Sequence, residues 1–266
     1  MKRQWSIKPS CGTQLNRAHP LMRGLYYALP MNEGGGVNVA NLAALGKPAT
    51  FPATHVSWGN GGITLDGTNN AWPTIPADAA LSTLTATLHI RLRANITGAQ
   101  YLYGDNNAAG TALFYAMQLT AANKVSCNWN SSAASTSTAA IPVGIITDIT
   151  VVRSGSSGSW TLLCYINGIL DSTFSISTNP ATCVSAQGIG GPGAYTGTGF
   201  TTNGTIYQFE IWNRDLSASE VQQMYMNPYC LMQPQRQLFT PDKLSGNPTT
   251  AGVGPKGVGF FWGGGD

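Results

Sequence analysis

The sequence predicts an all-β protein, a sandwich or jelly roll built from short antiparallel strands. Three observations carry this prediction: many short apolar runs end at turn residues, only 9% of the residues are charged, and a single segment has helical spacing. About 25% charge is usual for a soluble globular domain. Here Ser, Thr, Asn, Gln and Gly replace the charged residues, and they suit strands and turns. The composition excludes a disordered chain and a helical bundle, and no apolar run is long enough to span a membrane.

The expected strands are short apolar or alternating runs that end at turn residues. The clearest signal is a hairpin, because two apolar runs flank Asn167-Gly168. This dipeptide is preferred in type I′ turns, since both of its residues tolerate a positive φ. Further strands are expected at 25–31, 56–65, 84–93, 101–103, 113–119, 124–129, 145–153 and 206–212.

The run 84–93 alternates between apolar and polar residues, which is typical of a strand with one buried and one wet face. Leu88 and Ile90 fall on the apolar face, whereas His89 and Arg91 fall on the polar face. We expect His89 to be a solvated strand residue rather than a metal ligand or a catalytic base, because no second histidine lies near it in the sequence.

One helix is expected near the C-terminus. Ser217 and Glu220 have the spacing of a capping box, in which the serine is the N-cap and the glutamate is the third helical residue. An apolar face follows, and Asn227-Pro228 ends the helix, because a residue before proline is disfavoured in helical geometry.

The two ends of the chain differ from the middle in composition. Residues 1–20 are polar, basic and broken by prolines, and residues 231–266 are rich in proline and glycine. We interpret both as extended arms that flank one domain at 21–230. The second arm ends in aromatic residues that need a surface to pack on. The residues expected to dock the arms onto a partner are Lys2, Arg3, Trp5, Lys8, Arg17, Phe260, Phe261 and Trp262.

The cysteines and the N-terminus indicate where the chain folds. The five cysteines are widely spaced without a CxxC pair, which favours buried small hydrophobic residues over a disulfide framework or a zinc site. The N-terminal MKRQWSIKPSCG lacks the apolar segment of a signal peptide, so we expect folding in a cytoplasm. A net charge of +3 is too small to indicate nucleic-acid binding.

A series of motifs along the chain resembles a known family. In this order the motifs resemble a laminin-G-like, concanavalin A-type jelly roll, in the stand-alone form common in tailed-phage genomes. The resemblance covers about residues 21–230, and it rests on the order of the motifs, since no single one is specific. They are HPLMRGLY at 19–26, NEGGG at 32–36, LDGTNNA at 65–71, ITVVR at 149–153, YINGIL at 165–170, GTIYQFEIWNR at 204–214, LSASEV at 216–221 and YMNP at 225–228.

The resemblance implies two packed antiparallel sheets and motifs that are mostly structural. Some members of the family bind calcium or a sugar on the concave face or the rim. The stretch 104–107 offers Asp105 and Asn106 as oxygen ligands for calcium, but its single carboxylate favours a plain turn. Aromatic residues that are exposed would stack on a sugar ring, and the alternative for them is a place in the core. The candidates for stacking are Trp129, Trp160 and Tyr195.

The sequence predicts that the protein is not an enzyme and binds no cofactor. Related jelly rolls of the glucanase type work with two carboxylates on one strand, in an E-x-D-x-E pattern. The best match here begins at Glu210, but Trp212 stands where the second carboxylate is needed. The glycines at 188–193 match GxGxxG by letters, yet no helix is expected after them, so a dinucleotide site is excluded.

Three functions remain as hypotheses. The first is a structural virion protein of a tailed phage, assembled in the host cytoplasm: a capsid decoration, head-fibre or minor capsid protein docked through its arms. Its partners would be the major capsid protein, fibre or tail components, or further copies of the chain. The alternative is a carbohydrate-binding adhesin module of a tail fibre or capsid surface, which binds host glycans. A hydrolase that uses Glu210 is the third, and neither nucleic acid nor a membrane is expected as a partner.

Overall fold

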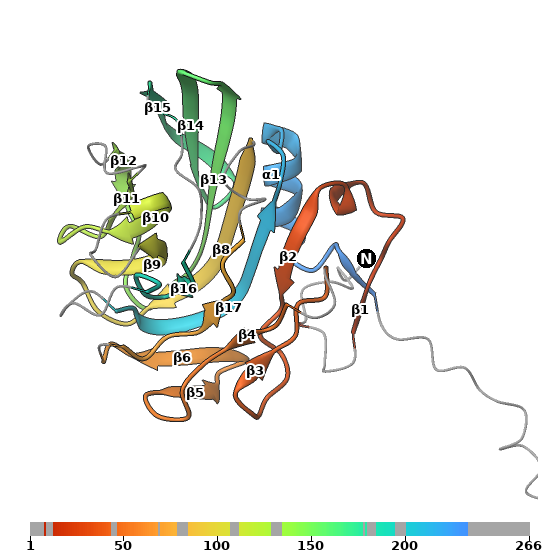
Figure 1. Ribbon diagram of the computed structural model, residues 1–266, viewed down its shortest axis with the longest axis vertical. Coiled ribbons are helices and arrows are strands. Elements are labelled where there is room, and N and C mark those ends of the chain that lie inside the picture. The colour runs from red at the N-terminus through yellow and green to blue at the C-terminus, as the bar shows by residue number, and fades with distance from the viewer. Residues whose placement is uncertain are drawn as a thin grey trace, which may run out of the picture. The chain divides into compact units, whose positions relative to one another are not determined.

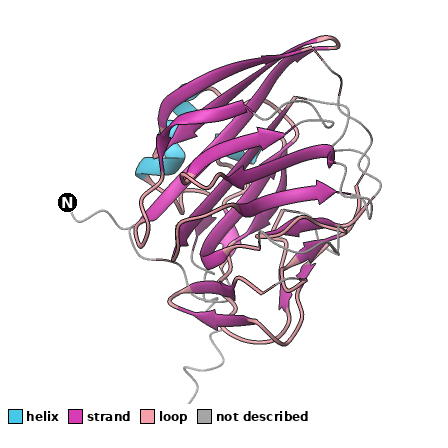
Figure 2. Ribbon diagram, turned by 90° about the vertical axis from the view of Figure 1, so that its left-hand side faces the viewer, coloured by secondary structure: helices cyan, strands magenta, loops and turns pink. Residues whose placement is uncertain are grey.

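The computed structural model describes residues 8, 13–43, 47–68, 70–78, 85–106, 112–128, 135–177, 179, 185–194 and 201–233, and it confirms the predicted sandwich of two antiparallel sheets. Figure 2 shows the two layers of strands. Sheet I has the order β15-β14-β13-β8-β17-β6-β5, with β2 beside the other end of β17. Its strands are β15 Ile169–Ile176, β14 Ser159–Ile166, β13 Ile146–Ser156, β8 Ala86–Ala94, β17 Asn203–Trp212, β6 Gly62–Asp66, β5 Val56–Gly59 and β2 Leu25–Leu29.

Sheet II has the order β12-β11-β10-β9-β16-β7-β4-β3. A separate pair of strands, β1 with β18, joins the two ends of the described domain. The strands of sheet II are β12 Ser135–Ala140, β11 Lys124–Asn128, β10 Ala112–Leu119, β9 Gln100–Asn106, β16 Gln187–Ile189, β7 Thr74–Ile75, β4 Ala49–Thr50 and β3 Asn38–Val39. The remaining elements are β1 Gln14–Leu15, β18 Met232–Gln233, the short 3-10 helix η1 Pro20–Met22 and helix α1 Ala218–Met226.

The predicted hairpin is present between β14 and β15. Asn167 and Gly168 have φ values of 51° and 75°, as a type I′ turn requires. Gly168 lies so close to Tyr225 of α1 that a Cβ atom at this position would be 2.8 Å from the tyrosine Cβ. The turn therefore needs glycine both for its backbone angle and for its contact with the helix.

The main core lies between the two sheets. The apolar face of β8 confirms its prediction, because Leu88, Ile90 and Leu92 are buried there with Phe209 of β17. Sheet II contributes residues such as Leu102 to the same cluster. Burial of this apolar surface is the main stabilising term of such a sandwich.

The other face of sheet I is also covered. Trp212 and Val152 are buried there against Val221 and Met224 of α1. Figure 1 shows α1 on the side of sheet I that faces away from β9–β12. Strands β8 and β17 in the middle of sheet I are therefore buried on both faces, whereas the sequence predicted a wet outer face for β8.

The ends of the described domain differ from the extended arms that the sequence predicted for them. Strand β1 pairs with β18, with Leu15 opposite Met232, and both residues are buried in the cluster under α1. Leu21 of η1 is buried with them. Residues 13–20 and 231–233 thus form part of the domain, because their apolar side chains cover the outer face of sheet I.

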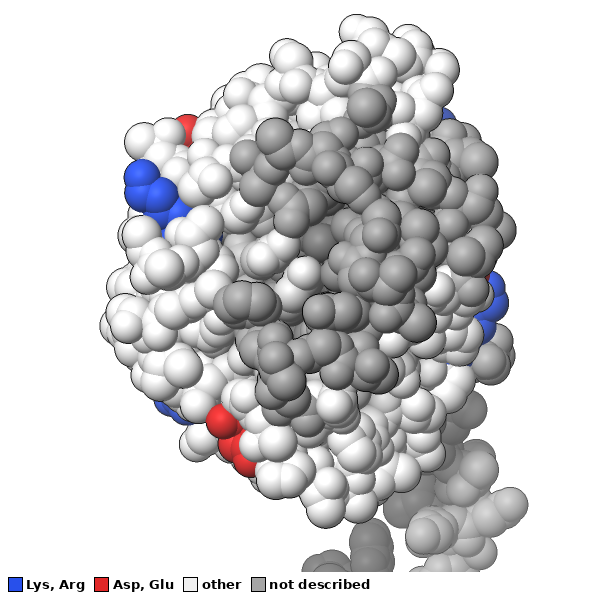
Figure 3. All heavy atoms as spheres, turned by 60° about the vertical axis from the view of Figure 1, so that its left-hand side comes forward, with Lys and Arg blue, Asp and Glu red and all other residues white. Residues whose placement is uncertain are grey.

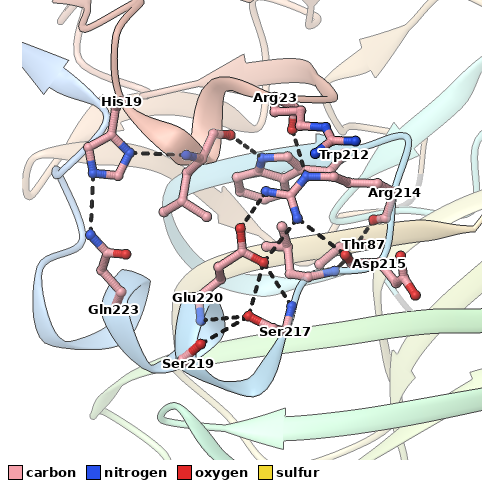
Figure 4. Close-up of polar contacts among 12 residues, drawn as sticks. His19, Arg23, Thr87, Trp212, Arg214, Asp215, Ser217, Ser219, Glu220 and Gln223 are labelled. Carbon is pink, nitrogen blue, oxygen red and sulfur yellow. Dashed lines mark hydrogen bonds and ion pairs between the residues drawn. The ribbon is translucent and has the colours of Figure 1, made fainter.

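Helix α1 begins as predicted. The Ser217 hydroxyl accepts a hydrogen bond from the Glu220 backbone N–H, and the Glu220 carboxylate accepts one from the Ser217 N–H. Arg214 adds a second anchor, because its two Nη atoms donate to the two carboxylate oxygens of Glu220 at 2.9 and 2.6 Å (Figure 4). Its Nε donates to the Arg23 carbonyl, so the helix start is tied to the turn before β2.

The glycines at 188–193 serve packing. Strand β16 leads directly into them, and a Cβ on Gly191 would lie 2.1 Å from the Trp72 ring. Cys127 and Cys164 are buried in the main core, which confirms their prediction as small core residues, and Cys230 is partly buried. Cys11 and Cys183 lie outside the described residues.

The described surface carries few charges. Figure 3 shows one face on which the visible Lys, Arg, Asp and Glu side chains are isolated and lie toward the margins. Among the described helices, none is long and apolar enough to cross a membrane.

Candidate functional site

A row of charged side chains lies on the outer face of sheet I, where three long strands meet. Strand register places Glu210 of β17 opposite His89 of β8, and Arg91 of β8 opposite Asp148 of β13. The prediction that His89 is solvated is wrong: only 1% of its surface is exposed. The alternation in the sequence assigns the face correctly, but it does not reveal that α1 and the residues after it cover this face.

His89 bridges two buried carboxylates. Its Nδ1 lies 2.7 Å from Glu210 Oε2, and its Nε2 lies 3.0 Å from Asp148 Oδ1. Asp148 Oδ2 accepts a hydrogen bond from Arg91 Nη1 at 2.6 Å. The four side chains form a linear series of alternating charge, Glu210–His89–Asp148–Arg91, which we call the charge row.

The geometry favours a protonated His89. Each ring nitrogen faces a carboxylate oxygen, and only an imidazolium can donate from both nitrogens. Burial opposes the charged form, but the hydrogen bonds to Asp148 and Glu210 and the charges of both carboxylates raise the pKa of His89 to about 9.

The segment after α1 covers the charge row. Gln208 donates from Nε2 to the Pro228 carbonyl at 2.8 Å and also to Glu210 Oε1. Burial raises the pKa of the neighbouring Tyr229 to about 12, and the charges of Arg91 and Glu210 also act on it. The buried carboxylates are therefore enclosed by polar partners, as buried charges require.

A pocket of about 770 Å³ opens beside the cationic end of the charge row. Arg91 and Lys8 line it together with tyrosines, amides and apolar side chains, and no carboxylate is part of its lining among the described residues. Tyr225 is 39% exposed and Met226 is 49% exposed, so the end of α1 forms an open aromatic and apolar wall. The other lining residues are Asn60, Gly61, Ile146, Tyr207, Asn227, Pro228 and Tyr229.

Lys8 is fixed to its own domain. Its Nζ donates to the carbonyls of Met31 at 2.6 Å and Tyr207 at 3.0 Å, and also to that of Gly61. Burial lowers the pKa of Lys8 to about 8, against the attraction of Glu33 and Glu210. The sequence assigned Lys8 to docking on a partner, whereas here its ammonium group binds backbone carbonyls of the same domain.

Two of the residues predicted to bind a sugar or calcium, Trp160 and Asp105, are buried. Trp160 is 7% exposed and lies in the interior, with the Arg153 guanidinium 5.4 Å from its ring centre, so the core alternative holds for it. Asp105 is fully buried within β9, and Asn106 is the last residue of that strand. The expected loop at 104–106 is therefore a strand. Within the described residues, no group of three His, Cys, Asp or Glu side chains has the arrangement of a metal site.

The remaining predicted residues divide into two groups. Arg17 is exposed and donates to the Leu42 carbonyl at 3.3 Å. The others lie outside the described residues: Trp129, Tyr195, Lys2, Arg3, Trp5, Phe260, Phe261 and Trp262.

Most of the pocket is not predicted by the sequence. No motif indicates Arg91 as a binding residue or Tyr207, Tyr225 and Tyr229 as aromatic lining. One signal was available: in a chain with so few charges, Arg91, Asp148 and Glu210 all fall within predicted strands, and charges on strands need partners.

The family of the chain is established by its sequence. Residues 65–222, more than half of the chain, match the family described as the Concanavalin A-like lectin/glucanases superfamily. The chain therefore belongs to this superfamily. A comparison with curated proteins finds no matching sequence.

Solved structures show the same fold. A Trypanosoma rangeli sialidase in complex with sialic acid has a TM-score of 0.60 at 15% identity, over 78% of this chain and 33% of the sialidase. The binding domain of botulinum neurotoxin serotype D has a TM-score of 0.57 at 9% identity, over 76% of this chain and 51% of the toxin domain. This chain spans about a third of the sialidase's length, and identities this low support only the common fold.

The charge row makes stability depend on pH. Because the pKa of His89 is raised to about 9 from 6.5, its contribution is complete below pH 6.5 and is lost as pH rises through 9. Lys8 has the opposite effect on stability: its pKa in the folded protein is lowered to about 8, so its contribution to the unfolding free energy increases as the pH rises above 8. The effect of His89 is therefore best measured between pH 6.5 and pH 8.

We predict that the unfolding free energy of the wild type, minus that of His89→Gln, falls by roughly 1–2 kcal/mol between pH 6.5 and 8. Urea unfolding at matched pH values measures this difference. Because both proteins share every other titrating group, a difference that stays constant over this window would show that His89 is not protonated in the folded protein.

Proposed function

We propose that the chain is a non-enzymatic glycan-binding module and that the pocket beside α1 is its binding site. The single observation that carries the proposal is the pocket itself. It combines an exposed aromatic side chain, Tyr225, with the Arg91 guanidinium and the amides of Asn60 and Asn227. Sugars present both apolar C–H faces and hydroxyl groups, so a site with this mixture of groups matches their chemistry.

The position of the carboxylates supports a binding rather than a hydrolytic role. Glycosidases of the common type need two carboxyl groups that reach the scissile bond. Asp148 and Glu210, the carboxylates of the charge row, are only 3% and 1% exposed. Their oxygens face His89, Arg91 and Gln208. A substrate would have to displace these partners before it could reach either carboxylate.

The first test removes the exposed aromatic wall. We expect Tyr225→Ala to weaken binding of a glycan selected on an array by about tenfold, or ~1.4 kcal/mol. Ile96→Ala is the matched control, since Ile96 is 47% exposed and does not line the pocket. Calorimetry of both variants makes the comparison. The proposal fails if the wild type retains no glycan, or if Tyr225→Ala binds as tightly as Ile96→Ala.

A second candidate is a structural role in a tailed-phage virion, as a capsid decoration, head-fibre or minor capsid protein. The pairing of β1 with β18 favours it, because Gln14 lies opposite Gln233. The described residues 13 and 233 therefore lie close together. Segments that extend from neighbouring points of one domain can engage one site on a larger particle.

The second test removes these segments separately. Deletion of residues 1–7, which keeps Lys8, and deletion of residues 235–266 are each expected to reduce retention on purified capsids while glycan binding stays unchanged. Co-sedimentation with capsids measures retention. If both truncated proteins sediment like the full chain, docking through the arms is wrong.

A further inference from the structure

We infer that the pocket beside α1 selects a glycan that carries a carboxylate, and that Arg91 is the residue that binds this group. The inference rests on the proposed glycan-binding function and names the class of sugar: an acidic saccharide such as one built from hexuronic acids. It follows from three features of the pocket, which are the sign of its lining charges, the free donors of Arg91 and the arrangement of the charge row.

The lining of the pocket is cationic. Arg91 and Lys8 are the charged residues of its described lining, and the carboxylates of the charge row lie behind the surface, where Asp148 is 3% and Glu210 is 1% exposed. Glu33 also attracts Lys8, but its oxygens accept hydrogen bonds from the backbone N–H groups of residues 32 and 40 and do not line the pocket. A ligand in the pocket therefore meets positive groups first.

Most of the hydrogen-bond donors of the Arg91 side chain are not used by described residues. A guanidinium offers five N–H donors in a planar fork that matches a carboxylate. Asp148 takes one bond from Nη1, and no other described residue accepts a hydrogen bond from this side chain. The side chain is 21% exposed. One part of the fork is thus fixed by Asp148, and the other part is open to the pocket.

The charge row keeps Arg91 positive toward the ligand. An Asp148 carboxylate paired with Arg91 alone would cancel much of its charge. Here Asp148 is shared with protonated His89, whose second nitrogen binds Glu210. The row is neutral as a whole, with its negative end at Glu210 inside and its positive end at Arg91 in the pocket. Such an arrangement attracts an anion without leaving an unpaired buried charge.

Lys8 attracts an anionic ligand by its charge but donates no hydrogen bond to it. Its three ammonium protons are donated to three backbone carbonyls, so it has no donor left for a ligand. Its positive charge still lies at the pocket wall, because Lys8 is part of the lining. Selectivity for a carboxylate therefore depends on Arg91, and Lys8 strengthens the field around it.

The experiment compares matched ligands. Oligosaccharides of alginate, polygalacturonate and hyaluronan are each measured beside the same oligosaccharide with its carboxylates reduced to alcohols. For the wild type we expect at least one acidic form to bind ten times more tightly than its reduced form. This preference should shrink at high salt, because charge attraction at a partly exposed site is screened. The comparison uses only the wild-type protein and so does not depend on the folding of a variant.

Two variants assign the preference to Arg91. Arg91→Gln should bind the acidic and the reduced forms equally, because only the acidic form gains from the guanidinium charge. Arg17→Gln, which removes an exposed arginine outside the pocket, should keep the full preference. Equal binding of acidic and reduced forms by the wild type, or a preference that survives in Arg91→Gln, overturns the inference and leaves the proposed function standing. If no form of any oligosaccharide binds, both are wrong.

Discussion

The pairing of the buried His89 imidazolium with two carboxylates is the interaction on which the outer face of sheet I depends. Three strands of sheet I place Glu210, His89 and Asp148 side by side, and ionised groups that are buried this deeply must be paired. The segment after α1, with Pro228 and Tyr229, lies beside them, on a face that the sequence alone suggests is wet. The same arrangement fixes Arg91 at the edge of the cover, where the pocket opens.

Features that depend on neighbours in the sequence were predictable. The capping box at Ser217 and Glu220 and the hairpin at Asn167-Gly168 are set by a few adjacent residues, and both are present as expected. The apolar alternation of β8 likewise predicted which residues enter the core, because side chains alternate strictly along a strand. The fold class followed from the sum of such local signals.

Features that depend on distant contacts were not predictable in the same way. His89 is buried by partners 59 and 121 residues away, and no local pattern indicates that cover. Trp160 was considered for sugar stacking, but it packs against Arg153 from the neighbouring strand. The pocket itself is formed by Lys8, Arg91 and the residues at the end of α1, and these meet only when the sheet is assembled.

The protonation state of His89 at neutral pH is the most direct test of this account. ¹⁵N chemical shifts of the imidazole ring, recorded from pH 6 to 10, report whether each ring nitrogen carries a proton. The account predicts that both nitrogens of His89 are protonated at pH 7.5 and that the ring titrates near pH 9. A neutral ring at pH 7.5, with one unprotonated nitrogen and a transition near the ordinary pKa of about 6.5, would contradict it.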